Sequence, residues 1–76
     1  MSTLDRITID PEVMGGRPCI RGYRVTVGII VGLLAAKHSW EEVRGMYPFL
    51  EDEDITQALQ YAAWMASERE VPVKRA

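Results

Sequence analysis

Hydrophobic and polar residues alternate near the start of the chain. The segment RITID, residues 6–10, places Ile7 and Ile9 on one face, which is typical of a short, half-buried strand. Pro11 ends this strand, because proline has no amide hydrogen to donate. A second segment, CIRGYRV at residues 19–25, alternates loosely and predicts one or two short strands interrupted by its glycine. The two segments together predict a short N-terminal β-hairpin.

The next segment, VGIIVGLLAAK, is apolar nearly all round and has helical spacing. Thr26 precedes it and is a good N-cap, so we predict a helix over about residues 27–37. A helix without a polar face is expected to be buried. The spacing Gly28-x-x-x-Gly32 permits a close backbone approach, although two small residues beneath a neighbouring element are the simpler interpretation.

Ser39 and Glu42 form a capping-box pattern, Ser-x-x-Glu, which opens a second helix over about residues 40–47. Pro48 ends this helix, because it cannot continue the backbone hydrogen bonds. The side chains expected to face inward are Trp40, Val43 and either Met46 or Tyr47. A turn then leads into a third helix.

The third helix is predicted over about residues 52–69, with Glu51 or Asp52 as its N-cap. The acidic run at 51–54 suits the positive end of the helix dipole. One apolar stripe consists of Ile55, Ala58, Leu59, Ala62 and Ala66. Beside it lie Tyr61, Trp64 and Met65. Because a small monomer has little reason to carry a helix that is apolar all round, we expect this second face to form a dimer interface.

These elements predict one α+β, mainly α, domain. It consists of a short N-terminal β-hairpin followed by a three-helix, homeodomain-like bundle of the helix-turn-helix type. We place the domain at residues 1–70, with the strands and a glycine-arginine loop at 6–25, and a short C-terminal tail at 71–76. For the tail, an added strand at 71–73 and a frayed end are both open.

A 76-residue chain has a small core and usually needs a disulfide, a metal or a partner chain. The single cysteine, Cys19, excludes an internal disulfide, and Cys19 with His38 provides too few ligands for zinc. Association is the remaining route, and we expect a homodimer or a complex. The longest run without a polar side chain, residues 27–36, is half of what spans a bilayer. No signal peptide opens the chain, so we expect a cytoplasmic protein with Cys19 reduced.

Charge is divided unevenly along the chain. Residues 1–38 carry five basic and three acidic side chains, a net of +2, and residues 39–76 carry four basic and eight acidic, a net of −4. Positive charge is concentrated in GGRPCIRGYRV, residues 15–25. Gly15, Gly16 and Gly22 allow positive φ angles there, so we interpret them as the structural residues of a tight loop.

The arginines of this segment are the candidate binding residues. Arg17, Arg21 and Arg24, with Tyr23 for stacking, suit a protein partner or a nucleic acid backbone. In the competing interpretation, they clamp the hairpin to acidic residues of the same or a second subunit and bind no ligand. The acidic residues available for such pairs are Asp5, Asp10 and Glu12, or the run at 51–54 of another subunit.

The pattern favours neither major-groove reading nor catalysis. A helix-turn-helix places the start of its last helix in the major groove, where the carboxylates at 51–54 would repel phosphates. Nothing in the sequence brings His38 to Cys19 as a general base, and a cysteine between Pro18 and Ile20 is typical of a buried apolar position. We therefore predict no catalytic residue, no metal and no cofactor.

Long motifs carry a resemblance to a known family. They are GGRPCIRGYRVTV and the later run SWEEV, YPFLEDEDI and YAA, within a match of roughly residues 7–63. On these motifs the chain resembles the bacterial and archaeal family called domain of unknown function 433. The resemblance implies a small β-hairpin joined to a homeodomain-like three-helix unit. It also implies an antitoxin of a type II toxin–antitoxin pair, related to the VapB class, whose partner is a PIN-like nuclease.

The chain departs from related families at the start of its third helix. Those families carry a cap such as threonine before PEDI, whereas this chain has EDEDI at residues 51–55. The extra acidity further weakens a DNA-reading role. Three functional hypotheses follow. The chain is a non-enzymatic, homodimeric binding module that partners a small nuclease, a DNA- or RNA-binding autoregulator that uses the arginine loop, or a self-associating structural domain without a ligand.

Overall fold

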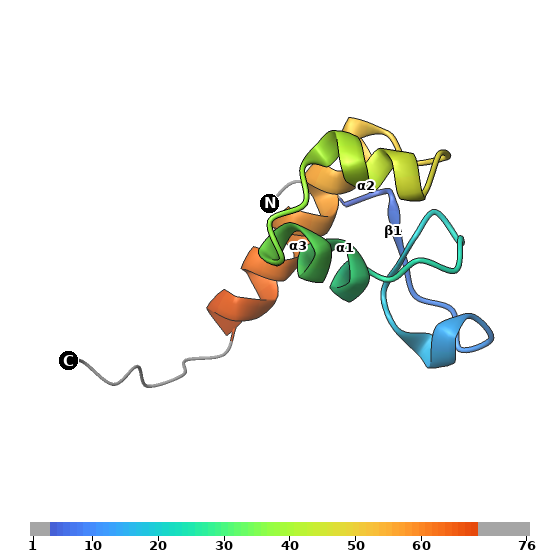
Figure 1. Ribbon diagram of the computed structural model, residues 1–76. Coiled ribbons are helices and arrows are strands. Elements are labelled where there is room, and N and C mark those ends of the chain that lie inside the picture. The colour runs from blue at the N-terminus through green and yellow to red at the C-terminus, as the bar shows by residue number, and fades with distance from the viewer. Residues whose placement is uncertain (1–3, 69–76) are drawn as a thin grey trace.

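The computed structural model describes residues 4–68, of which Glu68 is described by its backbone alone. A short β-hairpin precedes three helices (Figure 1). In chain order the elements are β1 (Ile7–Thr8), the 3-10 turn η1 (Met14–Gly16), β2 (Cys19–Ile20), α1 (Val27–Ala35), α2 (Trp40–Met46) and α3 (Asp52–Glu68). The α+β, mainly α, prediction is confirmed. The tail at 71–76, with the strand considered at 71–73, lies outside the described residues.

The two strands of the hairpin are antiparallel. Ile7 lies opposite Ile20, and Thr8 lies opposite Cys19. β1 is shorter than the predicted strand at 6–10, because pairing ends at Thr8 and Ile9 is 61% exposed. Only Ile7 of the two predicted inward isoleucines packs against the core.

The segment that follows β2 turns back alongside it. The Ile20 N–H donates to the Val25 carbonyl at 3.1 Å, and Cys19 forms an isolated bridge with Thr26. The second predicted strand segment is therefore one short strand and its return, interrupted around Gly22 as expected. This return leads directly into α1.

Thr26 caps α1 as predicted, because its Oγ1 accepts a hydrogen bond from the Ile29 N–H at 3.0 Å. The helix ends at Ala35, two residues before the predicted end at 37. Lys37 has a φ of 74°, and the N–H groups of Lys37 and His38 donate to the carbonyls of Leu34 and Leu33. This pair of hydrogen bonds is typical of a helix C-terminus. The predicted end was wrong because no glycine marks this left-handed position.

The capping box of α2 is confirmed. The Ser39 hydroxyl accepts from the Glu42 N–H at 3.0 Å, and the Ser39 N–H donates to Glu42 Oε1 at 2.8 Å. The second of these bonds is the main reason why the pKa of Glu42 is lowered. The helix ends at Met46, one residue before the predicted end, and Pro48 follows it.

The inward face predicted for α2 is partly wrong. Val43 is buried, and of the two alternatives Tyr47 packs against the core while Met46 is 46% exposed. Only Trp40, which is 37% exposed, contradicts the prediction. α2 is two turns long and packs mainly on α1, so it buries only one narrow side.

The hydrophobic core lies where the hairpin and the three helices meet. α1 packs against both α2 and α3, and β1 packs against α3. The buried members of the core are Ile20, Val25, Val27, Ile30, Val43, Leu50, Ile55 and Ala58. The core holds the hairpin beside the start of α3, which positions the candidate site.

The prediction that α1 is buried on all sides is wrong. Val27 and Ile30 are buried, whereas Gly28, Gly32 and Ala35 are exposed. α2 and α3 cover only part of the helix circumference within the described chain, so an apolar strip of α1 faces outward.

Candidate functional site

One arginine of the glycine-arginine loop joins the hairpin to α3. Arg21 contacts Asp54 through two bonds: Nε donates to Oδ1 at 3.0 Å, and Nη2 donates to Oδ2 at 2.8 Å. Nη2 also donates to the Phe49 carbonyl at 2.8 Å. The Asp54 side chain is 0% exposed, so these charge-assisted bonds replace the water that its carboxylate has lost.

A second arginine reaches the same carboxylate. Arg6 Nη1 donates to Asp54 Oδ1 at 3.1 Å and to Glu51 Oε1 at 2.6 Å. The Glu51 N–H donates to Asp54 Oδ2 at 2.8 Å, so Asp54 also satisfies an amide at the N-terminus of α3. We call Arg6, Arg21, Glu51 and Asp54 the arginine–carboxylate cluster.

The cluster keeps its buried carboxylate ionised. Burial by itself would raise the pKa of Asp54, but hydrogen bonds from Arg21, the Glu51 amide and Arg6 outweigh burial and lower that pKa. The pKa of Arg6 is raised chiefly by its bond to Glu51, and the pKa of Arg21 chiefly by its bonds to Asp54. Asp54 and both arginines are therefore charged at neutral pH.

The turn that carries Arg21 is unusual for a residue with a side chain. Arg21 has a φ of 47° and Gly22 a φ of 77°, and the Tyr23 N–H donates to the Ile20 carbonyl at 2.8 Å. Two successive positive φ angles are typical of a type I′ turn, which favours glycine and asparagine. The left-handed conformation costs backbone energy at Arg21, which its bonds to Asp54 offset.

An aromatic stack braces the same turn. The Tyr23 ring lies on the Phe49 ring, with centroids 4.0 Å apart and planes 21° apart. The Arg21 guanidinium carbon is 5.3 Å from the centre of the Tyr23 ring. Tyr23 is 41% exposed, so it is held in place and still presents part of its ring to solvent.

Arg17 and Arg24 differ from Arg21. Both residues are exposed, and within residues 4–68 neither side chain forms an ion pair. Gly15 and Gly16, with φ angles of 67° and 83°, form the turn that precedes Arg17, as their predicted role requires. The structure thus brings one of the three loop arginines to α3 and leaves the other two at the surface.

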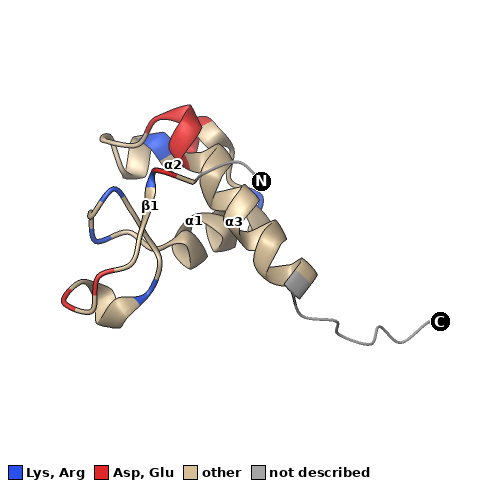
Figure 2. Cartoon of the chain, turned by 180° about the vertical axis from the view of Figure 1, so that it is seen from behind, with Lys and Arg blue, Asp and Glu red and all other residues tan. Residues whose placement is uncertain are grey.

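The remaining carboxylates at the start of α3 are also engaged within the chain. Figure 2 shows acidic residues gathered where α3 begins. Asp52 pairs with Arg44, and Glu53 accepts a bond from Gln57 Nε2 at 3.3 Å. Gln57 Nε2 donates in addition to Asp5 Oδ1 at 2.9 Å. The acidic residues at 51–54 therefore bind side chains of the hairpin and of α2. These contacts within the chain are sufficient to explain why the start of α3 is acidic.

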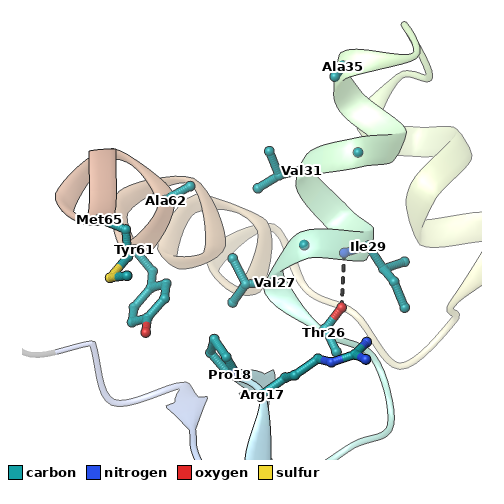
Figure 3. Close-up of a pocket in the computed structure, with 12 residues that line it drawn as sticks. Arg17, Pro18, Thr26, Val27, Ile29, Val31, Ala35, Tyr61, Ala62 and Met65 are labelled. Carbon is teal, nitrogen blue, oxygen red and sulfur yellow. Dashed lines mark hydrogen bonds between the residues drawn. The ribbon is translucent and has the colours of Figure 1, made fainter. Parts of the chain in front are cut away.

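A groove of about 670 Å³ lies between α1 and the C-terminal half of α3 (Figure 3). Its helical walls are formed by Val27, Gly28, Ile29, Val31, Gly32 and Ala35 of α1 and by Tyr61, Ala62 and Met65 of α3. Arg17 and Pro18 lie at its base, and among the described residues Arg17 is the one charged member of the lining. The groove is open and mostly apolar within the part of the chain that the structure describes, with the Arg17 guanidinium as its charged group.

The three candidate interface residues of α3 have different surroundings. Tyr61 packs partly against the core, and Tyr61 and Met65 both line the groove. Trp64 is 45% exposed, and its ring centre lies 5.9 Å from that of Tyr61. Their contact with a second chain stays a prediction at this point.

The cysteine and the histidine lie in separate, ordinary environments. Cys19 is 1% exposed, burial raises the pKa of its thiol, and the thiol donates to the Arg17 carbonyl at 3.3 Å. His38 Nδ1 lies 3.6 Å from Glu42 Oε1 in the connection between α1 and α2. Across residues 4–68 we find no group of three or more potential metal-ligating side chains. No helix in this part of the chain is long and apolar enough to cross a membrane.

The sequence pattern indicates a helix cap at 51–54 and misses the buried role of Asp54. A signal was present, because Asp54 precedes the buried Ala58 by one helical turn and so shares its inward face. A charged residue on such a face requires an opposite charge. No sequence pattern of this kind predicts the groove, since the groove depends on how α1 and α3 cross.

The fold and these surfaces define a small α+β domain in which a hairpin is tied to a three-helix unit. The family model for protein of unknown function (DUF433) matches residues 7–62, and the chain belongs to this family. Uncharacterized protein y4eO of Sinorhizobium fredii (strain NBRC 101917 / NGR234) is 39% identical over 56 residues. The match covers 74% of this chain and 25% of that relative, so the chain spans about a quarter of the relative's length. No solved structure matches the chain.

Proposed function

We propose that the protein is a non-enzymatic, homodimeric binding module that acts as an antitoxin-like partner of a PIN-like nuclease. The observation that carries the proposal is that the three loop arginines have different partners. Arg21 is bound to Asp54, whereas Arg17 and Arg24 are exposed and form no ion pair within residues 4–68. The family resemblance supplies the class of partner.

The chemistry of an exposed arginine suits this partner. PIN-like nucleases bind magnesium through clustered carboxylates, which are oxygen ligands that a guanidinium also pairs with. An arginine inserted among them occupies the position of the metal and removes the ion that the nuclease requires. Arg24 follows Tyr23, which is stacked on Phe49, so the loop presents the cation from a braced turn. A braced turn loses less entropy on binding than a loose one.

The first test is recovery and inhibition of the nuclease. The tagged protein is captured from nuclease-treated native extract, and we expect a PIN-like protein in stoichiometric amount. The purified partner, assayed with magnesium on single-stranded RNA, is then inhibited by the wild-type protein. Arg24→Glu and Arg17→Glu are expected to weaken inhibition at least about tenfold, because each replaces attraction by repulsion next to carboxylates.

Lys37→Glu is the matched control, because it makes the same charge change at an exposed residue outside the loop. Arg21→Glu is unsuitable as a binding test, since it places a carboxylate against buried Asp54 and disturbs the fold. The proposal fails if no PIN-like protein is recovered, or if Lys37→Glu weakens inhibition as much as the two loop variants.

A second candidate function is nucleic acid binding by the same loop. The observation in its favour is the partly exposed Tyr23 ring next to Arg24, a pairing that suits base stacking and phosphate contact. Phosphate contacts predict affinity that falls steeply between about 50 and 200 mM salt. Absence of binding to duplex DNA and to single strands at low salt would remove this candidate.

The third hypothesis, a self-associating domain without another ligand, is supported by the clamp between Arg21 and Asp54. That clamp assigns a folding role to part of the loop. The hypothesis requires capture experiments to return only the protein itself. It therefore makes the opposite prediction to the nuclease proposal in the same experiment.

A further inference from the structure

The C-terminal half of α3 presents an apolar face that the described chain does not cover. Leu59 and Trp64 are 36% and 45% exposed, and Ala63 and Ala66 are exposed beside them. Figure 1 shows this half of α3 extending past α1, away from the hairpin. The face adjoins the groove, because Tyr61, Ala62 and Met65 on the same turns form one of its walls.

The chain therefore carries a ridge and a recess side by side. The ridge is aromatic and consists of the exposed surface of α3 around Trp64. The recess is the groove, whose opposite wall bears Gly28 and Gly32 and so lets another backbone come close. A twofold axis brings the same surface of two copies together, so a ridge beside a recess allows each ridge to enter the recess of the other copy.

Charge permits the same occupant. Within residues 4–68, Arg17 is the only charged residue in the groove lining. α3 from residue 52 to 68 contains no lysine, arginine or histidine, and its charged residues are all acidic. A second copy of α3 thus enters the groove without repulsion from Arg17, and the negative pole at the C-terminal end of that helix favours a nearby cation.

We propose that two copies of the chain associate through this surface, with the C-terminal half of α3 of each copy seated in the α1–α3 groove of the other. The proposal rests on the homodimer included in the proposed function and assigns its interface. It explains why α1 is apolar on its outward strip. It also explains why α3 lacks polar residues between Gln60 and Ser67.

Gly32 offers a test that leaves the fold of each copy intact. A Cβ added at Gly32 meets nothing within 4 Å, so a larger side chain there projects into the groove. Replacing glycine inside a helix also raises helix propensity. Gly45 in α2 is the matched control, because a Cβ there likewise meets nothing within 4 Å and Gly45 is not in the groove lining.

The experiment measures the mass of the full chain in solution between about 1 and 200 µM by sedimentation equilibrium. We expect the wild type and Gly45→Leu to reach twice the chain mass of 8.6 kDa. Gly32→Leu fills the recess and Trp64→Ala removes the ridge, so each is expected to weaken dimerisation at least about tenfold. Circular dichroism spectra of all variants are expected to match that of the wild type.

Two outcomes overturn the proposal. One is a wild type that stays monomeric at about 200 µM. That result would mean that a second copy is not what covers the groove. The other is a dimer that Gly32→Leu and Trp64→Ala leave unchanged. Both outcomes concern the isolated chain, so they are distinguishable from failure of the nuclease proposal, which is measured with a second protein and with the variant at Arg24, a residue outside the groove lining.

Discussion

The carboxylate of Asp54 makes two kinds of contact. It accepts a hydrogen bond from the Glu51 N–H at the start of α3, and it pairs with Arg6 and Arg21 of the hairpin. With Glu51 the cluster has two cations and two anions, so it carries no net charge. The cost of burying Asp54 is offset only while its partners are present, because an unpaired buried charge is strongly destabilising.

Asp54→Asn keeps the size of the side chain and removes its charge. We expect the free energy of unfolding to fall by about 2–4 kcal/mol, because the three bonds from Arg6 and Arg21 lose their carboxylate acceptor and both arginines keep weaker partners. Urea denaturation followed by circular dichroism measures this change. Asp52→Asn is the control, since Asp52 pairs with Arg44 at an exposed position, and its effect is expected to be much smaller.

The same variant has a defined pH dependence. The pKa of Asp54 is lower in the folded chain than its ordinary value of 3.8, so its stabilising contribution is present above pH 3.8 and is lost as the pH falls through the folded pKa. The stability difference between wild type and Asp54→Asn should therefore be constant near neutrality and shrink in acid. A difference that grows as the pH falls would contradict the assignment of Asp54 as ionised.

Local chemistry determines where each helix begins. Thr26 and the Ser39–Glu42 pair cap α1 and α2 through contacts three residues apart, which a sequence pattern can capture. Thr26→Val removes the hydroxyl that accepts the Ile29 N–H and is expected to cost about 1 kcal/mol, or about 4–8 °C in Tm. Thr56→Val within α3 is the control, and thermal unfolding of both variants should separate a cap from a change of residue type.

The sequence pattern does not predict features that depend on contacts between elements far apart in the chain. The outward strip of α1 and the exposure of Trp40 follow from how α2 and α3 pack, since burial of a helix face requires a neighbour. The end of α1 was missed because Lys37, without glycine, takes the left-handed position. The bond between Arg21 and Asp54 joins residues 33 positions apart, and no spacing rule connects the two.

At the scale of the whole molecule, two surfaces divide the chain. The hairpin loop bears the exposed arginines, and the α1–α3 groove bears the apolar lining, with Arg17 shared between them. The arginine–carboxylate cluster links the hairpin to α3, one of the two helices that form the groove. A change that loosens the cluster is therefore expected to affect both surfaces, whereas Gly32→Leu affects the groove alone.

The cluster also has a consequence for the time course of folding. Its bonds join residues 33 and 48 positions apart, whereas the helix caps join residues three apart. Contacts between distant residues require a large loop to close first, so we expect them to form after the transition state. Asp54→Asn should then speed unfolding and leave the refolding rate nearly unchanged in stopped-flow experiments at low protein concentration. Equal effects on both rates would instead show that the hairpin docks early.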